Sequence, residues 1–234
     1  MDTILRFVQG VMENHPGDMR GKRVLVTAGP TEEPLDPVRY IGNRSSGKMG
    51  FAVAAAAAQR GADVTLIAGP VHLETPLHIR RVNVVTAQEM YEAVHAEFAG
   101  VDLVVMAAAV ADFAPVAPSR TKIKRDAVPG GRMTIDLKQN PDILRSLGEK
   151  KGRQVLVGFA LETDDGVQNA RTKLATKRLD AVVLNNPTDE GSGFGADTNV
   201  VTVITAGGLC ERLPKMLKFD VANTILDRVL PLLR

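Results

Sequence analysis

The chain has 234 residues, of which 44% are hydrophobic and 4% aromatic, and its net charge is +2. This length suits one large domain with a small appendage, and the hydrophobic content is ample for a buried core. The weak net charge does not by itself indicate a nucleic-acid partner. The single cysteine, Cys210, excludes an intrachain disulfide and fits a reducing compartment.

The N-terminal segment is unlike a signal peptide, because Asp2 and Glu13 lie among its apolar residues. The longest apolar run, 103–111, is shorter than the roughly 18 residues that span a bilayer. We therefore expect a cytoplasmic protein with no membrane partner. Helical spacing of apolar residues predicts a helix over 2–14, which a His-Pro-Gly-Asp sequence at 15–18 ends. Residues 1–20 are interpreted as a linker, and residues 21–234 as the main domain.

Strand and helix patterns alternate from residue 23 onward. The sequence predicts strands over 23–28, 63–68, 79–85, 102–108, 154–160 and 181–184, a hairpin of 199–205 with 209–213, and helices over 47–60, 86–98, 164–179 and 215–233. A further helix is expected to begin at Asn140 as its N-cap, with Pro141 in the first helical position. This alternation predicts an α/β fold with a Rossmann-like, doubly wound, mostly parallel sheet.

Ligands of doubly wound sheets bind at the carboxyl ends of the strands. The loops expected to converge on such a site are those that follow Ala28, Ala108, Ala160 and Leu184. The loop over 29–46 is long and contains three prolines, which favours a functional segment over a simple surface connection.

The end of this loop is typical of an anion site. Gly47, Lys48 and Gly50 stand at the start of an alanine-rich helix, where unpaired N–H groups and the helix dipole favour a negative charge. Residues 42–49 nearly match a phosphate-binding P-loop, but Met49 replaces the hydroxyl that binds magnesium, and the segment does not follow its strand directly. A P-loop fold is therefore not favoured.

The segment 113–139 predicts a small β excursion from the main sheet. It contains a basic run at 122–125 (Lys-Ile-Lys-Arg). The residues alone favour an ordinary solvated strand, leave a dimer edge open, and least favour a nucleic-acid patch, since no aromatic residue adjoins them.

Other charged residues leave alternatives open. Asp112 follows a buried strand and suits either a ligand's polar edge or a turn cap. Lys173 and Lys177 lie on one helical face, either to meet a phosphate or to be solvated. The four histidines have no metal or catalytic-triad spacing.

Together these segments resemble the phosphopantothenoylcysteine synthetase family, the ligase half of the bacterial bifunctional coenzyme A biosynthesis protein. The resemblance rests on VTAGPTEEPLDPVRYIGNRSSGKMGF (26–51), AAAVADF (107–113), KIK (122–124), NPDIL (140–144), VGFALET (157–163), ARTKLATKRLD (170–180) and NNP (185–187). These segments occur in order across nearly the whole chain, and none is a generic nucleotide motif.

The resemblance implies a two-step ligation. 4′-Phosphopantothenate and CTP would form an acyl-cytidylate and pyrophosphate, and the amine of L-cysteine would then displace CMP. It also implies magnesium, held mainly through the triphosphate rather than by protein ligands, and a homodimer built by the 113–139 excursion. The linker over 1–20 would be the stub of an upstream decarboxylase domain, and no FMN is expected in this chain.

The resemblance also implies site residues. The nucleotide would bind Met106, Ala108, Asp112, Lys122, Pro141, Asp142, Ile143, Leu144, Phe159, Lys173 and Lys177. The substrate would bind Asn43, Arg44, Ser45, Ser46, Gly47 and Lys48. Asn43 and Lys122 would be catalytic, and Asn43 would promote breakdown of the acyl-cytidylate.

Two other hypotheses remain open on the sequence. An NAD(P)-dependent oxidoreductase on a Rossmann-like fold would carry an acidic residue at the end of the second strand, where Ala68, Gly69 and Pro70 stand instead. A basic RNA-binding module would use 120–125 and 173–178, and its binding would weaken steeply with salt.

Overall fold

The structure is a computed structural model that describes residues 17–127, 131–162, 164–186, 189–193 and 195–233. The helix expected over 2–14 lies outside these residues, as does most of the expected linker over 1–20. The described part of the chain contains no helix long and apolar enough to cross a membrane.

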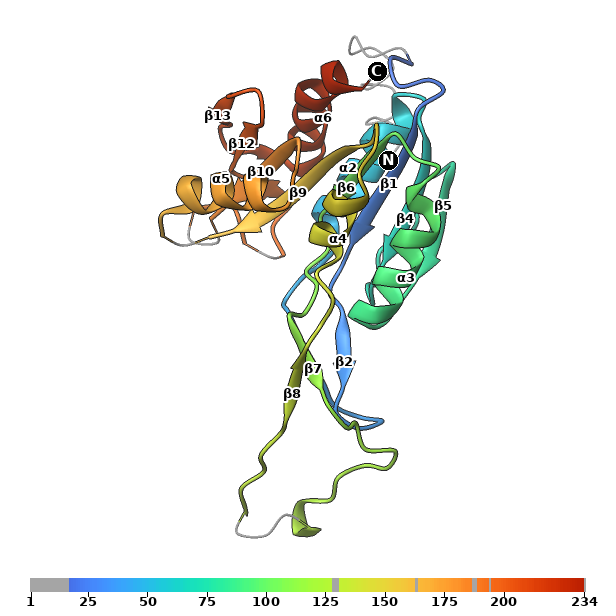
Figure 1. Cartoon of the computed structure of the whole chain (residues 1–234), viewed down its shortest axis with the longest axis vertical. Helices are drawn as coiled ribbons and strands as arrows, with labels where there is room; N and C mark the ends of the chain where they lie inside the picture. The colour runs from blue at the N-terminus through green and yellow to red at the C-terminus, as the bar shows by residue number, and fades with distance from the viewer. Residues whose placement is uncertain (1–16, 128–130, 163, 187–188, 194, 234) are drawn as a thin grey trace.

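An eight-stranded sheet forms the centre of the molecule (Figure 1). Its strands, in spatial order, are β13 (Cys210–Arg212), β12 (Val201–Thr205), β10 (Ala181–Asn185), β9 (Val155–Leu161), β6 (Leu103–Met106), β1 (Arg23–Ala28), β4 (Asp63–Ala68) and β5 (Ile79–Asn83). The six strands from β10 to β5 are parallel, and β12 and β13 add an antiparallel edge. The order of the parallel strands is that of dinucleotide-binding sheets, with the reversal between β1 and β6.

Helices cover both faces of this sheet. One face packs against α2 (Lys48–Gln59) and α6 (Lys218–Val229), and the other against α3 (Ala87–Phe98), α4 (Ile143–Lys150) and α5 (Gly166–Thr176). The two buried apolar clusters that result confirm the doubly wound fold. The apolar strands are buried on both sides, as central parallel strands must be.

Small residues let α2 lie close to the sheet. A Cβ atom on Gly50 would stand 2.5 Å from the Cβ of Ala28, which is closer than van der Waals contact. The start of α2 is thereby held against the end of β1. This close approach brings the N-terminus of the helix to the carboxyl edge of the sheet, where ligands of such folds bind.

An arm extends from this edge (Figure 1). We define the arm as the hairpin of β2 (Glu32–Pro34) with β3 (Tyr40–Gly42) and the described residues of 113–139, in which β7 (Phe113–Pro115) pairs with β8 (Leu137–Gln139). The predicted excursion is confirmed, and each of its two strands is three residues long.

The basic run is not a strand. Residues 122–124 are irregular, and a short 3-10 turn, η1, spans Arg125–Ala127. The prediction of a solvated strand was wrong because the backbone of Ile123 is committed elsewhere: its N–H binds the Asp36 carboxylate and its carbonyl accepts from Arg39.

The closing helix is also shorter than predicted. Two short strands, β11 (Thr198–Asn199) and β14 (Met216–Leu217), pair just before α6. The 3-10 turn η3 (Leu230–Leu232) follows α6. Because Met216 and Leu217 pair with β11, helix formation is delayed to Lys218.

Candidate active site

Two adjoining cavities lie at the carboxyl edge of the sheet, beside the reversal in strand order. The α4-side cavity has a volume of about 190 Å³ and reaches from the end of β6 to α4 and α5. The α2-side cavity has a volume of about 180 Å³ and reaches from the N-terminus of α2 to the N-terminus of α6. Ala108 and Phe159 line both cavities, so groups bound in the two cavities would meet there.

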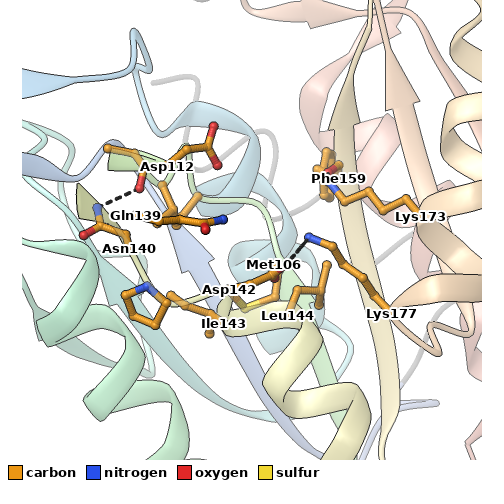
Figure 2. Close-up of a pocket in the computed structure, with 14 residues that line it drawn as sticks. Met106, Asp112, Gln139, Asn140, Asp142, Ile143, Leu144, Phe159, Lys173 and Lys177 are labelled. Atoms are coloured by element: carbon orange, nitrogen blue, oxygen red, sulfur yellow. Dashed lines mark hydrogen bonds and ion pairs between the residues drawn. The ribbon is translucent and has the colours of Figure 1, made fainter. Parts of the chain in front are cut away.

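The α4-side cavity gathers ten of the eleven residues expected at a nucleotide (Figure 2). They are Met106, Ala108, Asp112, Pro141, Asp142, Ile143, Leu144, Phe159, Lys173 and Lys177. They come from the end of β6 and the segment that follows it, from β9, from the start of α4 and from the last turn of α5. Segments up to 71 residues apart, Met106 to Lys177, are brought together because their strands end at the same edge.

The start of α4 differs from the prediction. Asp142, not Asn140, is the N-cap, and its carboxylate accepts from the Arg145 N–H at 3.0 Å. Asn140 is unavailable as a cap because its side chain donates to the Ala111 carbonyl and its N–H donates to that of Asp112. The N-cap thus adds a carboxylate to the cavity wall, which Asn140 also lines.

The two lysines of α5 are held in different ways. Lys177 forms an ion pair with Asp142 at 2.9 Å, and the dashed line in Figure 2 marks it. Lys173 donates to the Phe159 carbonyl at 2.6 Å. Burial lowers the pKa of the Lys173 amine, and the charge of Lys177 lowers it further. Burial would raise the pKa of the Asp142 carboxyl, but the hydrogen bonds from Lys177 and from the Arg145 N–H, together with the charges of these two residues, outweigh it and lower the pKa.

Asp112 is exposed at the rim of this cavity. Its backbone carbonyl accepts the Asn140 N–H at 2.8 Å, which joins the two ends of the 113–139 excursion. Lys122 is different: it lies in the arm, is exposed, and does not line the cavity of its own chain.

The α2-side cavity includes the expected turn and its neighbours. Arg44, Ser45, Ser46, Gly47 and Lys48 all line it. Asn43 is exposed next to this turn and donates to the Val110 carbonyl at 2.9 Å. That bond ties the turn to the segment after β6.

Four further residues of this cavity escaped sequence reasoning, namely Ser192, Gly193, Asn199 and Lys218. They arrive from the far end of the chain, over a connection with no recognisable motif. Only Lys218 carried a usable signal. It stands on the apolar face of α6 with Val221 and Ala222, and a buried lysine in such a position is uncommon.

Two lysines also meet in the α2-side cavity. Lys48 forms an ion pair with Asp197 at 2.8 Å and donates to the Gly195 carbonyl at 2.8 Å. Lys218 is buried and donates to the Ala196 carbonyl. Burial lowers the pKa of the Lys218 amine, and the charge of Lys48 lowers it further.

Each cavity therefore has the same arrangement of charge. One lysine is paired with a carboxylate, and a second, more buried lysine rests on a backbone carbonyl. Two like charges close together in a partly buried site are unfavourable unless an anion joins them. This arrangement suits two anionic ligands, one in each cavity.

The fold and these cavities define a Rossmann-like α/β protein whose lysine-containing cavities, at the switch in strand order, suit anionic ligands. Residues 19–232 match the family model of the DNA/pantothenate metabolism flavoprotein C-terminal domain, and the chain belongs to this family.

Two bacterial relatives agree with this assignment. The chain is 47% identical over 218 residues to the coenzyme A biosynthesis bifunctional protein CoaBC of Bacillus subtilis (strain 168), covering 93% of this chain and 53% of the relative. It is 48% identical over 194 residues to the CoaBC of Vibrio parahaemolyticus, covering 82% and 48%. The chain thus spans about half the length of these relatives.

Among solved structures, the C-terminal domain of a CoaBC protein matches with a TM-score of 0.78 and 39% identity, covering 92% of this chain and 97% of that chain. The expected family resemblance is confirmed. The match gives no support to the oxidoreductase hypothesis, whose acidic residue at the end of β4 is absent from the sequence.

Proposed function

We propose that this chain is a phosphopantothenate–cysteine ligase of coenzyme A biosynthesis that activates its substrate with CTP. The observation that carries the proposal is the pair of adjoining lysine-containing cavities that share Ala108 and Phe159. A ligase of this kind must hold two polyanions and bring a carboxylate to an α-phosphorus, and positioning of this kind accounts for a large part of such catalysis.

The α4-side cavity would hold the nucleotide. Asp112 and the backbone of 141–144 would contact the ribose and the base, and Lys173 and Lys177 would face the triphosphate. Asp142 offsets the charge of Lys177 when no nucleotide is bound. An incoming triphosphate would take over that role.

The α2-side cavity would hold 4′-phosphopantothenate. Since its carboxylate must reach the α-phosphorus, it belongs near Ala108, Phe159 and Asn43. The phosphate would then lie at the other end, near Lys48 and Lys218. This assignment is supported by the two helix N-termini there, since both α2 and α6 begin at the cavity.

The reaction then proceeds in two displacements. A carboxylate oxygen attacks the α-phosphorus of CTP and pyrophosphate leaves, which gives the acyl-cytidylate. The uncharged amine of cysteine attacks the acyl carbon, the bond to the cytidylate oxygen breaks, CMP leaves, and the amine loses a proton. The lysines stabilise the charge that develops on the phosphate oxygens. Asn43 would contact the activated acyl group and promote the second step.

Magnesium would accompany the triphosphate. No group of three or more His, Cys, Asp or Glu side chains is placed to hold a metal ion within the described residues. The ion would neutralise phosphate charge and favour departure of pyrophosphate.

A homodimer through the arm, in the cytoplasm, belongs to the same proposal. Large apolar side chains are exposed along the arm, namely Val38, Tyr40, Phe113, Val116, Met133 and Leu137. A concentration of exposed apolar surface on one element marks an interaction site. Lys122 does not line the α4-side cavity of its own chain. In the dimer it would then serve the site of the second copy.

Pyrophosphate release tests this function. The protein would be incubated with 4′-phosphopantothenate and magnesium, and with CTP, ATP, GTP or UTP, with and without cysteine. The proposal predicts release with CTP and formation of CMP only when cysteine is added. Release with ATP alone would contradict the choice of base, and no release from folded protein with any nucleotide would contradict the ligase.

A further inference from the structure

The Asp36 carboxylate is buried at the tip of the β2–β3 hairpin, with its side chain fully shielded from solvent. Its Oδ1 accepts from the N–H groups of Val38 at 2.8 Å and Arg39 at 2.9 Å. These two bonds close the tip of the hairpin. They are local and leave the second carboxylate oxygen free for other partners.

That second oxygen, Oδ2, reaches across to the excursion. It accepts from the Ile123 N–H at 3.1 Å and from the Arg39 guanidinium at 2.5 and 3.0 Å. The same guanidinium donates to the Ile123 carbonyl at 2.5 Å. Both peptide groups of Ile123 are therefore tied to the hairpin tip by charge-assisted hydrogen bonds, which are roughly twice as strong as neutral ones.

The rest of this short segment is also ordered. The Ser119 N–H donates to the Leu35 carbonyl at 2.9 Å, and the Ser119 hydroxyl closes a turn by donating to the Thr121 carbonyl. Lys122 lies between these anchors. Its carbonyl group and the Ile123 N–H that binds Asp36 form one peptide group. Burial would raise the pKa of the Asp36 carboxyl, but the hydrogen bonds from Val38, Arg39 and Ile123 outweigh it and hold the pKa well below its usual range.

We propose that Asp36 is a positioning residue for Lys122: its carboxylate fixes the backbone on which Lys122 is presented to the nucleotide. The catalytic role of Lys122 itself rests on the proposed function. An otherwise exposed lysine on an irregular segment would sample many positions. The Asp36–Arg39–Ile123 contacts restrict that freedom before the nucleotide binds, and such preorganisation is what charge stabilisation in a transition state requires.

The substitution Asp36→Asn separates the two functions of this carboxylate. The amide oxygen can still accept from Val38 and Arg39 and close the hairpin. The amide nitrogen, facing the Ile123 N–H and the guanidinium, cannot accept from either. Asp126→Asn, at an exposed carboxylate of the same excursion, makes the same change of charge without touching the hairpin tip and is the matched control.

We expect Asp36→Asn to lower kcat/KM for CTP about tenfold in pyrophosphate release, and Asp126→Asn to stay within twofold. Lys122→Met should cost about 100-fold in the wild-type background, a usual loss for one charge-stabilising donor. It should cost only about tenfold in the Asp36→Asn background. If Asp36 had only a structural role, the fold-losses of the two substitutions would multiply in the double variant. Amide hydrogen exchange of 119–124 should be at least tenfold faster in Asp36→Asn.

The outcomes are distinguishable. Suppose that the wild-type protein releases pyrophosphate and that Lys122→Met is impaired. A fully active Asp36→Asn, or a double variant in which the two fold-losses simply multiply, would then overturn the positioning role and leave the ligase intact. An active wild type with an unaffected Lys122→Met would overturn it as well. If the wild-type protein releases no pyrophosphate, the proposed function fails. Hydrogen exchange then tests whether Asp36 holds the backbone of this segment, and unchanged exchange of 119–124 in Asp36→Asn would overturn that role.

Discussion

The two cavities share one arrangement of charge but are built in different ways. In each, one lysine pairs with a carboxylate and the other rests on a backbone carbonyl. The α4-side cavity draws its polar residues from loops and helices next to adjacent parallel strands. The α2-side cavity joins an N-terminal turn to residues near α6, and Lys48 and Asp197 are 149 residues apart. The same arrangement of two lysines and a carboxylate can therefore be built from segments that are close together or far apart in the sequence.

The largest expected effect concerns Lys173, the more buried of the two lysines in the α4-side cavity. Lys173→Met should lower the rate of CTP-dependent pyrophosphate release by about 100-fold, because it removes a preorganised cation from the triphosphate. Arg171→Met, at an exposed position of the same helix, is the matched control and should stay within twofold. Steady-state assays measure both. A Lys173→Met enzyme as active as the control would contradict the assignment of this cavity to the nucleotide.

The equivalent lysine of the α2-side cavity should affect a different substrate. Lys218→Met is expected to raise KM for 4′-phosphopantothenate about tenfold, because one charged hydrogen bond is lost, and to leave KM for CTP nearly unchanged. Lys215→Met, which removes only an exposed ion pair with Glu190, is the control. Melting temperatures of both variants confirm that they fold. A change confined to KM for CTP would reverse the assignment of the cavities.

The smallest expected effect is on stability. Asp142→Asn keeps a side chain that can cap α4 but loses the ion pair with Lys177, so the free energy of unfolding should fall by about 0.5 kcal/mol at pH 7. The pKa of Asp142 is lowered in the folded protein. Its contribution is therefore complete above the usual aspartate pKa and is lost as the pH falls through the lower folded value.

Urea unfolding of wild type and Asp142→Asn from pH 7 to pH 3 checks this sign. The difference between the two proteins should narrow as the pH falls below about 4. Asp126→Asn, at an exposed aspartate of the arm, makes the same change of charge and serves as a control. A difference that stays constant or widens in acid would contradict the ion pair as its cause.

The sheet could be predicted because strands and helices are marked by patterns of neighbouring residues. The strand over 23–28 and the alanine-rich helix after it have unmistakable patterns, and both are confirmed. The family motifs then identified the lining of the α4-side cavity, although they lie in strands, loops and a helix. Their binding roles stay predictions.

Tertiary contacts explain what the sequence did not reveal. The Asn140 cap was wrong because that side chain bonds across the base of the arm to Ala111. The basic strand was wrong because Ile123 bonds to Asp36 and Arg39, 84 or more residues away. Lys218 was missed because only the folded chain brings the start of α6 to the α2-side cavity. In each case, long-range hydrogen bonds or packing override local patterns.

A crystal structure with 4′-phosphopantothenate and a non-hydrolysable analogue of CTP tests the central claim most directly. The account predicts the nucleotide in the α4-side cavity, with its triphosphate beside Lys173 and Lys177. It predicts the phosphate of the substrate beside Lys48 and Lys218, and the carboxylate near Ala108 and Phe159. A nucleotide bound in the α2-side cavity, or a substrate carboxylate at Lys218, would contradict it.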